Sequence, residues 1–306
     1  MNSMNNMNNK LHPYWITGFT DAEGCFFIGI SKNSGRNIGW RVSPGFEIRL
    51  HLRDKNLILQ IKSFFKDIGT IGIYKNNIYY RVNNVKDILE IIIPHFEKYS
   101  LITQKQGDFI LWKEIIKLIY KKEHLNKDGF MQILNLRAYL NRGFSNKLNQ
   151  NFPNVIKVKR PKITLPINID YNWIAGFYSG EGCFHIYISK SLKNNVKPAV
   201  HLLLYINQHS RDEALINNLN RIFECGYTFN HSSNNARVFS VTRFKDIYEK
   251  IIPFFKLYKI VGTKALDFED FCKGAELINK KAHLTAEGLK LLQAVKLKMN
   301  KNRYIK

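Results

Sequence analysis

The chain has 306 residues, of which 45% are hydrophobic and 13% aromatic, so it can bury two ordinary cores and is not a disordered polymer. Its 47 lysines and arginines exceed its 24 acidic residues by 23, and the folded surface should carry a field that attracts polyanions. Nucleic acid is the first partner to consider, although solubility or codon bias could also produce a basic composition.

The sequence also argues against a membrane-spanning protein and against a fold held by disulfides. No apolar run is long enough to cross a bilayer, so we expect no membrane partner. Residues 1–14 begin with MNSMNNMNNK and should form a polar tail, with neither a signal core nor an arginine-rich transit stretch. The four cysteines are widely spaced without a C-x-x-C pair, which favours reduced thiols.

The first half begins with a short helix that should end at Glu23 and Gly24. We expect strands roughly at 25–32, 41–50, 70–74 and 78–82, and helices at about 55–66, 86–98 and 103–121. Phe26, Ile28 and Ile30 alternate with Phe27, Gly29 and Ser31, as is typical of a sheet with one face on a core.

The second half repeats the first. WITGFTDAEGCF, from Trp15, returns as WIAGFYSGEGCF, from Trp173, at an offset of 158 (173 − 15). After a one-residue slip the offset is 159, and IIIPHFEKY matches KIIPFFKLY, KEHLNKDGF matches KAHLTAEGL, and Asn141 matches Asn300. Fusion of a former homodimer subunit predicts this register, and with it a pseudo-two-fold monomer.

This repeat sets the expected domain boundaries. We expect one half at 15–144, a second at 171–306, and between them a linker at 145–170. The linker has three prolines, many charges, and no helical or strand period.

The outward positions of both sheets carry side chains suited to hydrogen bonding and stacking on nucleic acid. The predicted DNA-binding residues are Arg41, Arg49, Tyr79 and Arg81 in the first half, and His185, Tyr187, Ser189, His201, Tyr205 and Asn207 in the second. An ordinary solvated sheet face is the alternative interpretation.

The repeated motif places an acid at the end of a helix rich in small residues. Small residues recur four apart, at Gly18 with Ala22 and at Gly176 with Gly180, which lets helix backbones approach closely. We expect each helix to stop at Gly24 or Gly182 in the left-handed conformation. The acid just before it faces the negative end of the helix dipole, which disfavours a carboxylate by up to about 1 kcal/mol.

Those acids are Glu23 and Glu181. If the two helices pack side by side, the carboxylates repel each other, and a hard divalent cation reverses both costs because Mg²⁺ accepts carboxylate and carbonyl oxygens. A solvated helix end could explain one such glutamate, but the same placement twice indicates function. Asp21, whose equivalent is Ser179, is not expected to be an essential ligand.

The doubled motif resembles the signature of the LAGLIDADG homing endonucleases, and the likeness extends over nearly all of both halves. It is most similar to the single-chain enzymes encoded in fungal mitochondrial introns, which implies a mitochondrial location. The resemblance implies an α+β fold of two αββαββα halves that form a saddle-shaped antiparallel DNA-binding sheet. It also implies that Glu23 and Glu181 bind Mg²⁺ or Mn²⁺ with the carbonyls of Ala22 and Gly180, and we expect Ca²⁺ to support binding without turnover.

The family often places a polar residue, commonly glutamine, and a basic residue near the scissile phosphates. In the second half these catalytic places look like Gln208 and Arg243. Their first-half equivalents by offset are Leu50 and Asn84, so the first half departs from the pattern.

The implied reaction is hydrolysis of both strands of a DNA duplex by two-metal chemistry, with 3′ overhangs. The target should be long and non-palindromic, because equivalent outward positions of the two halves carry different residues. Arg49 is equivalent to Asn207, and Arg81 to Ser240. An RNA maturase that binds its host intron RNA, or a non-catalytic nucleic-acid-binding protein, is the alternative function. Neither binding role needs paired acids, so the sequence favours the nuclease.

Overall fold

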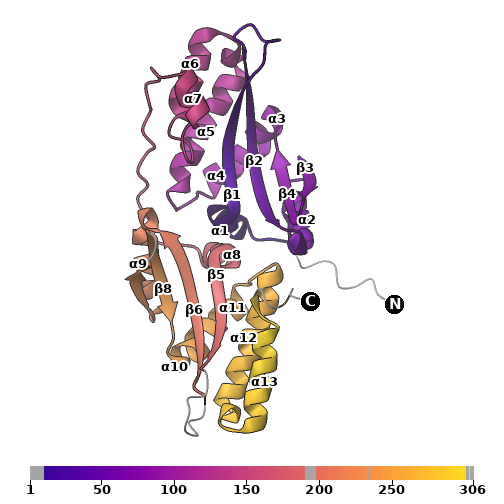
Figure 1. Ribbon diagram of the computed structural model, residues 1–306, viewed down its shortest axis with the longest axis vertical. Coiled ribbons are helices and arrows are strands. Elements are labelled where there is room, and N and C mark those ends of the chain that lie inside the picture. Colours follow the sequence, from indigo (N-terminus) through magenta and orange to yellow (C-terminus); the bar gives the residue numbers. More distant parts are fainter. Residues whose placement is uncertain (1–9, 190–197, 233–234, 301–302, 304–306) are drawn as a thin grey trace, which may run out of the picture. The chain divides into compact units, whose positions relative to one another are not determined.

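The computed structural model describes residues 10–189, 198–232, 235–300 and 303 (Figure 1). The chain divides into two compact units, Met1–Asn168 and Ile169–Lys306, each with its own sheet and helices. Most of the predicted tail, residues 1–9, lies outside the described residues. Within the part of the chain that is described, no helix combines the length and apolar character needed to cross a membrane.

The first unit has the predicted order of helix, two strands, helix, two strands and helices. Its first six main elements are α1 (Pro13–Glu23), β1 (Gly24–Lys32), β2 (Trp40–His51), α2 (Lys55–Phe64), β3 (Thr70–Tyr74) and β4 (Asn77–Val82). The helices that follow are α3 (Val85–Asp87), α4 (Ile93–Lys98), α5 (Lys105–Tyr120), α6 (Lys127–Arg137) and α7 (Asn146–Asn151). A five-residue π-helical turn, Ile88–Ile92, interrupts the single helix expected at 86–98.

The sheet of the first unit is antiparallel, in the order β1-β2-β4-β3. Its inner face is aromatic: Phe26 on β1 pairs with Phe46 on β2, and both rings are completely buried. Helix α5 covers this face, with the rings of Phe109 and Trp112 at 5.3 and 5.1 Å from that of Phe26. The predicted alternation along β1 is therefore confirmed for Phe26 and Ile28, and removing one such ring would cost about 3–5 kcal/mol.

The second unit repeats this architecture. Its elements are α8 (Tyr171–Glu181), β5 (Gly182–Ile188), β6 (Val200–His209), α9 (Glu213–Phe223), β7 (Tyr227–Asn230), β8 (Ala236–Val241), α10 (Phe244–Asp246), a π-helical turn (Ile247–Ile251), α11 (Ile252–Leu257), α12 (Thr263–Asn279) and α13 (Ala286–Leu297). The sheet order is β5-β6-β8-β7, the same as in the first unit. The predicted α+β class and the repeated αββαββα order are confirmed.

The matched asparagines of the repeat have the same structural task in both units. Asn141 donates its side-chain amide to the carbonyl of Phe26 at 2.7 Å, and Asn300 donates to that of Phe184 at 3.0 Å. Each thereby attaches the segment that follows α6 or α13 to the first strand of its unit. The predicted match between these positions reflects a shared packing role.

The segment expected to be a plain linker is partly helical and binds to the first unit. Helix α7 lies within it, begins after the capping hydroxyl of Ser145, and buries Leu148. Farther on, Arg160 forms an ion pair with buried Asp108 at 2.9 Å. The missing helical period in 145–170 did not reveal α7, because one buried leucine and a serine cap stabilise a helix too short to give a visible period.

Candidate metal centre and nucleic-acid interface

Each motif helix passes directly into the first strand of its sheet. Gly24 has φ −77° and ψ 153°, and Gly182 has φ −71° and ψ 155°, so both are extended and the predicted left-handed conformation is wrong. The glycines are needed for space instead. A Cβ at Gly24 would lie 2.4 Å from Cγ2 of Thr20, and one at Gly182 would lie 1.9 Å from Cδ1 of Tyr178.

The structure brings Gln208 to Glu181. Gln208, on β6, donates from Nε2 to Oε1 of the glutamate at 3.3 Å, and Glu181 is exposed as the last residue of α8. Arg243 is also exposed and occupies the residue before α10. An amide beside a helix-end carboxylate can orient that carboxylate or a water molecule next to it.

The first half lacks this amide, as the sequence comparison predicts. Leu50 is half-buried at the position equivalent to Gln208. Asn84, equivalent to Arg243, caps α3: its Oδ1 accepts from the backbone N–H of Lys86 at 2.9 Å and of Asp87 at 3.2 Å. The two equivalent positions therefore carry different groups in the two halves: leucine against glutamine, and a capping asparagine against an exposed arginine.

Two lysines that contact the motif helices were not among the predicted site residues. Lys105, the first residue of α5, donates from Nζ to the carbonyl oxygens of Thr20 at 2.9 Å and Ala22 at 3.4 Å. Lys264, on α12, donates to those of Gly180 at 2.6 Å and Gly182 at 2.5 Å. Lys264 follows Lys105 by 159 residues, the same offset that relates the two halves, so the repeat alone could have identified them as an equivalent pair.

The ammonium groups change the electrostatics of the helix ends. A cation beside the last carbonyls of a helix is favoured by its dipole, so each lysine offsets part of the cost of the neighbouring glutamate. Ala22 and Gly180 are also the carbonyls expected as metal ligands, and each accepts a cationic donor here. Among the described residues no three His, Cys, Asp or Glu side chains form a metal cluster, so a metal at either helix would draw on backbone carbonyls.

Asp21 and Ser179 anchor the motif helices by hydrogen bonds to neighbouring segments. Buried Asp21 accepts hydrogen bonds from the backbone N–H of Ile102 at 3.0 Å and from Oγ1 of Thr103 at 2.5 Å. Ser179 accepts from the backbone N–H of Val261 at 3.2 Å. Both residues tie a motif helix to the chain just before α5 or α12, a structural task in keeping with the expectation that Asp21 is not an essential ligand.

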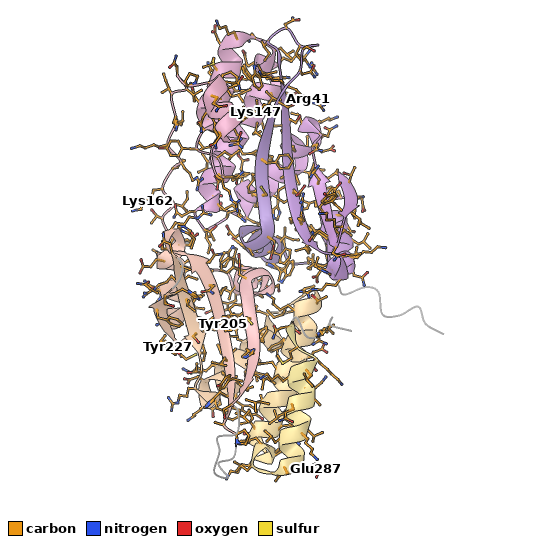
Figure 2. The ribbon with its side chains drawn as sticks, viewed as in Figure 1. Arg41, Lys147, Lys162, Tyr205, Tyr227 and Glu287 are labelled. Carbon is orange, nitrogen blue, oxygen red and sulfur yellow. The ribbon has the colours of Figure 1, made fainter. Side chains whose placement is uncertain are left out.

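The predicted DNA-binding residues all remain accessible. Those classed as exposed are Arg41, Arg49, Tyr187 and His201, and those that are half-buried are Tyr79, Arg81, His185, Ser189, Tyr205 and Asn207. Figure 2 labels Arg41 near the start of β2 and Tyr205 along β6. Ser189 lies one residue beyond the end of β5, where its hydroxyl accepts from the backbone N–H of Ala199 at 2.8 Å.

Two aromatic groups on the second sheet have shifted acidity. Burial, and secondly the charge of Lys296, lowers the pKa of His185, so its imidazole stays neutral and offers one donor and one acceptor. Burial raises the pKa of Tyr205 to about 12, so its hydroxyl remains a donor. His201 and Tyr187 stack with ring centroids 6.2 Å apart.

Comparison with known sequences gives several intron-encoded endonucleases as relatives. The profile described as LAGLIDADG endonuclease matches residues 16–116 and 174–275. Probable intron-encoded endonuclease 2 of Neurospora crassa is 41% identical over 291 residues, which cover 91% of this chain and 63% of that protein. Probable intron-encoded endonuclease 3 of the same organism is 33% identical over 283 residues, covering 92% and 53%. The chain thus spans only 63% and 53% of the length of these two relatives.

A more distant relative is the uncharacterized mitochondrial protein RF1 of Saccharomyces cerevisiae. It is 24% identical over 324 residues, which cover 99% of this chain and 62% of that protein.

Solved structures agree with the sequence comparison. The LAGLIDADG homing endonuclease I-SmaMI bound to cleaved DNA matches with a TM-score of 0.93 and 39% identity, over 97% of this chain and 99% of that chain. I-SmaMI bound to an uncleaved DNA target with calcium ions matches with a TM-score of 0.92 and 40% identity, over 95% and 100%. A variant of I-SmaMI with two lysines changed to alanine matches with a TM-score of 0.93 and 39% identity, over 95% and 100%. This chain is therefore a member of the LAGLIDADG endonuclease family that carries the family's repeat twice.

Proposed function

We propose that the chain is a divalent-metal-dependent DNA endonuclease that cuts both strands of a long, non-palindromic target and leaves 3′ overhangs. One observation carries this proposal: both motif helices end in a glutamate, and in both a lysine ammonium lies on the adjoining carbonyls. A protein that only binds nucleic acid needs no such duplicated arrangement.

Glu23 with the carbonyl of Ala22, and Glu181 with that of Gly180, would hold the metal ions. The fit rests on the donor set, because these carbonyls already attract a cationic donor and Mg²⁺ or Mn²⁺ takes oxygen ligands. The ions would lower the pKa of bound water and stabilise the attacking and leaving oxygens. Ca²⁺, which accepts looser geometry, should support binding without turnover.

The chain's own side chains would assist in three ways. Gln208, hydrogen-bonded to Glu181, would fix the carboxylate and orient the attacking water in the second half. Lys105 and Lys264 would hold the helix-end carbonyls in place and add positive charge beside the phosphate. The interval between these lysines equals that between the two lysines replaced in the I-SmaMI variant. Arg243 would contact phosphate from the start of α10.

Duplex binding would use the outward faces of both sheets. Basic side chains such as Arg41 would bind phosphates, whereas Tyr205 and Asn207 would meet base edges. Each half would read its own half-site as part of one monomer, since the two faces differ in sequence. A mitochondrial location is supported by the relationship to the mitochondrial protein RF1.

Selection of cleaved sites from a randomised duplex library, with Mg²⁺ or with a chelator, tests this function. We expect one long asymmetric site, 3′ overhangs, and no product with the chelator. If no duplex is cut although the chain binds folded intron RNA tightly, the maturase alternative replaces the nuclease.

A further inference from the structure

One carboxylate lies among the arginines on the outward face of the first sheet. Glu47, on β2, pairs directly with Arg81 on β4, and Arg49 follows on the same face of β2. Oε2 of Glu47 accepts from Nε of Arg81 at 2.6 Å, and Oε1 accepts from Nε of Arg49 at 3.0 Å. The side chain of Glu47 is only 12% exposed, so both of its oxygens are committed to these two guanidinium groups.

Two aromatic rings, those of Phe27 and Tyr79, pack against the guanidinium of Arg81. The rings of Phe27 and Tyr79 lie across Gly45 and Gly72 of neighbouring strands: a Cβ at Gly45 would lie 2.2 Å from Cζ of Phe27, and one at Gly72 would lie 2.3 Å from Cζ of Tyr79. The Cζ atom of Arg81 lies 4.7 Å from the centroid of the Tyr79 ring and 5.6 Å from that of Phe27. Arg81 is therefore held at the edge of its guanidinium by Glu47 and on one face of it by the aromatic rings.

This arrangement leaves the arginines available to a ligand. The side chains of Arg81 and Arg49 are 31% and 48% exposed. Because Nε and Nη2 of Arg81 face Glu47, its remaining N–H groups are directed away from the carboxylate. The cluster presents donors in a fixed direction rather than two mobile positive charges.

A carboxylate on this face would lower affinity for any duplex, because it repels phosphates and cancels one of the two arginine charges. The fold does not require it. The equivalent positions in the second half carry Tyr205, Asn207 and Ser240, and that sheet forms with the same strand order. Glu47 therefore serves neither general affinity for DNA nor the formation of the sheet, and its contacts with the two arginines need another explanation.

We propose that Glu47 is a specificity-determining positioning residue, which holds Arg81 and Arg49 so that they donate to base edges rather than to phosphates. This rests on the proposed function in that it takes duplex DNA as the ligand. An arginine held in plane can donate two hydrogen bonds to O6 and N7 of guanine in the major groove. Once released, the same arginine reaches the nearest phosphate and binds every sequence alike.

The test compares wild type, Glu47→Gln and the charge-matched control Glu114→Gln, whose carboxylate pairs with Lys117 on α5. Binding is measured in Ca²⁺ to the selected target, to its single-base variants and to unrelated duplex. We expect Glu47→Gln to lose about tenfold preference at one or two adjacent base pairs, to bind unrelated duplex at least as tightly as wild type, and to show a steeper salt dependence. The control should match wild type throughout.

A second variant, Arg81→Lys, keeps the charge but loses the planar fork. It should relax the same base pairs, and the double variant should relax them no further than either single one. With the fold shown to be intact by circular dichroism, either of two results would overturn the proposal: unchanged base preference in Glu47→Gln, or an equal loss of affinity for all sequences. Selective binding without cleavage contradicts the proposed function only, whereas the absence of any base preference in wild type contradicts both.

Discussion

The ammonium of Lys264 donates to the carbonyl oxygen of Gly180 at 2.6 Å, one residue before the glutamate that ends α8. Lys105 makes the corresponding contact with Ala22 in the first half. The chain thus places a cation at each helix end where a carboxylate alone would be disfavoured. The same contact links the last turn of each motif helix to α5 in the first half and to α12 in the second.

Replacing Lys264 with alanine should slow cleavage of the selected target by about 10²-fold, because a preorganised donor beside the reacting phosphate is lost. Lys290→Ala removes an exposed lysine of α13 in the same unit and should leave the rate unchanged. Single-turnover cleavage in Mg²⁺ measures both variants. Equal rates for Lys264→Ala and wild type would show that the lysine has no part in the reaction.

Replacing Gly24 with alanine should destabilise the first unit by about 1–3 kcal/mol, because the new methyl group would overlap Thr20. Gly29→Ala is the matched control on the same strand, since its Cβ would lie 3.5 Å from the nearest atom, an ordinary contact. Urea unfolding followed by circular dichroism gives both values. A Gly24→Ala protein as stable as the control would contradict the close approach seen at the end of α1.

The stability of the first unit should fall in acid through His95. Burial lowers the pKa of His95 to about 3, against an ordinary value of 6.5, so the folded unit excludes a proton that the unfolded chain binds. The contribution of neutral His95 is therefore complete above pH 6.5 and declines by about 1.4 kcal/mol per pH unit down to about pH 3. His95→Phe, which copies Phe254 of the second half, should remove this part of the pH dependence. Unfolding free energies of both proteins between pH 7 and 4.5 decide the matter, and parallel curves would contradict the assignment.

Much of the fold was predictable because its signals are local or repeated. The alternation at Phe26 and Ile28 predicts which face of β1 is buried, and the offset between Trp15 and Trp173 predicts two similar halves. The conformation of Gly24 was not predictable, because a glycine at a helix end suits either a left-handed turn or a close contact, and only the packing of Thr20 distinguishes them.

The candidate site shows the same division. The family resemblance predicted Gln208 near a scissile phosphate but gave no partner for it, and the structure places its amide on Glu181. Lys264 is distant in sequence from Gly180, so its contact depends on how α12 packs. Glu47 was missed for another reason: a single acid in a strand gives no sign of its neighbours until the register of β2 and β4 is known.

The central claim is that Glu23 and Glu181 act as metal-binding catalytic carboxylates, and Glu181→Gln tests it most directly. Glutamine keeps the shape and removes the charge, so metal binding should fail while the protein still folds. Glu287→Gln, an exposed acid on α13 labelled in Figure 2, is the matched control.

The measurement is double-strand cleavage of the selected target in Mg²⁺, with duplex binding and thermal unfolding recorded on the same samples. The account predicts that Glu181→Gln still binds the duplex, melts no lower than wild type in metal-free buffer, and loses cleavage by at least about 10³-fold, or roughly 4 kcal/mol of transition-state stabilisation. Glu23→Gln should behave alike, and Glu287→Gln should cut normally. Cleavage by Glu181→Gln at the wild-type rate would contradict the account.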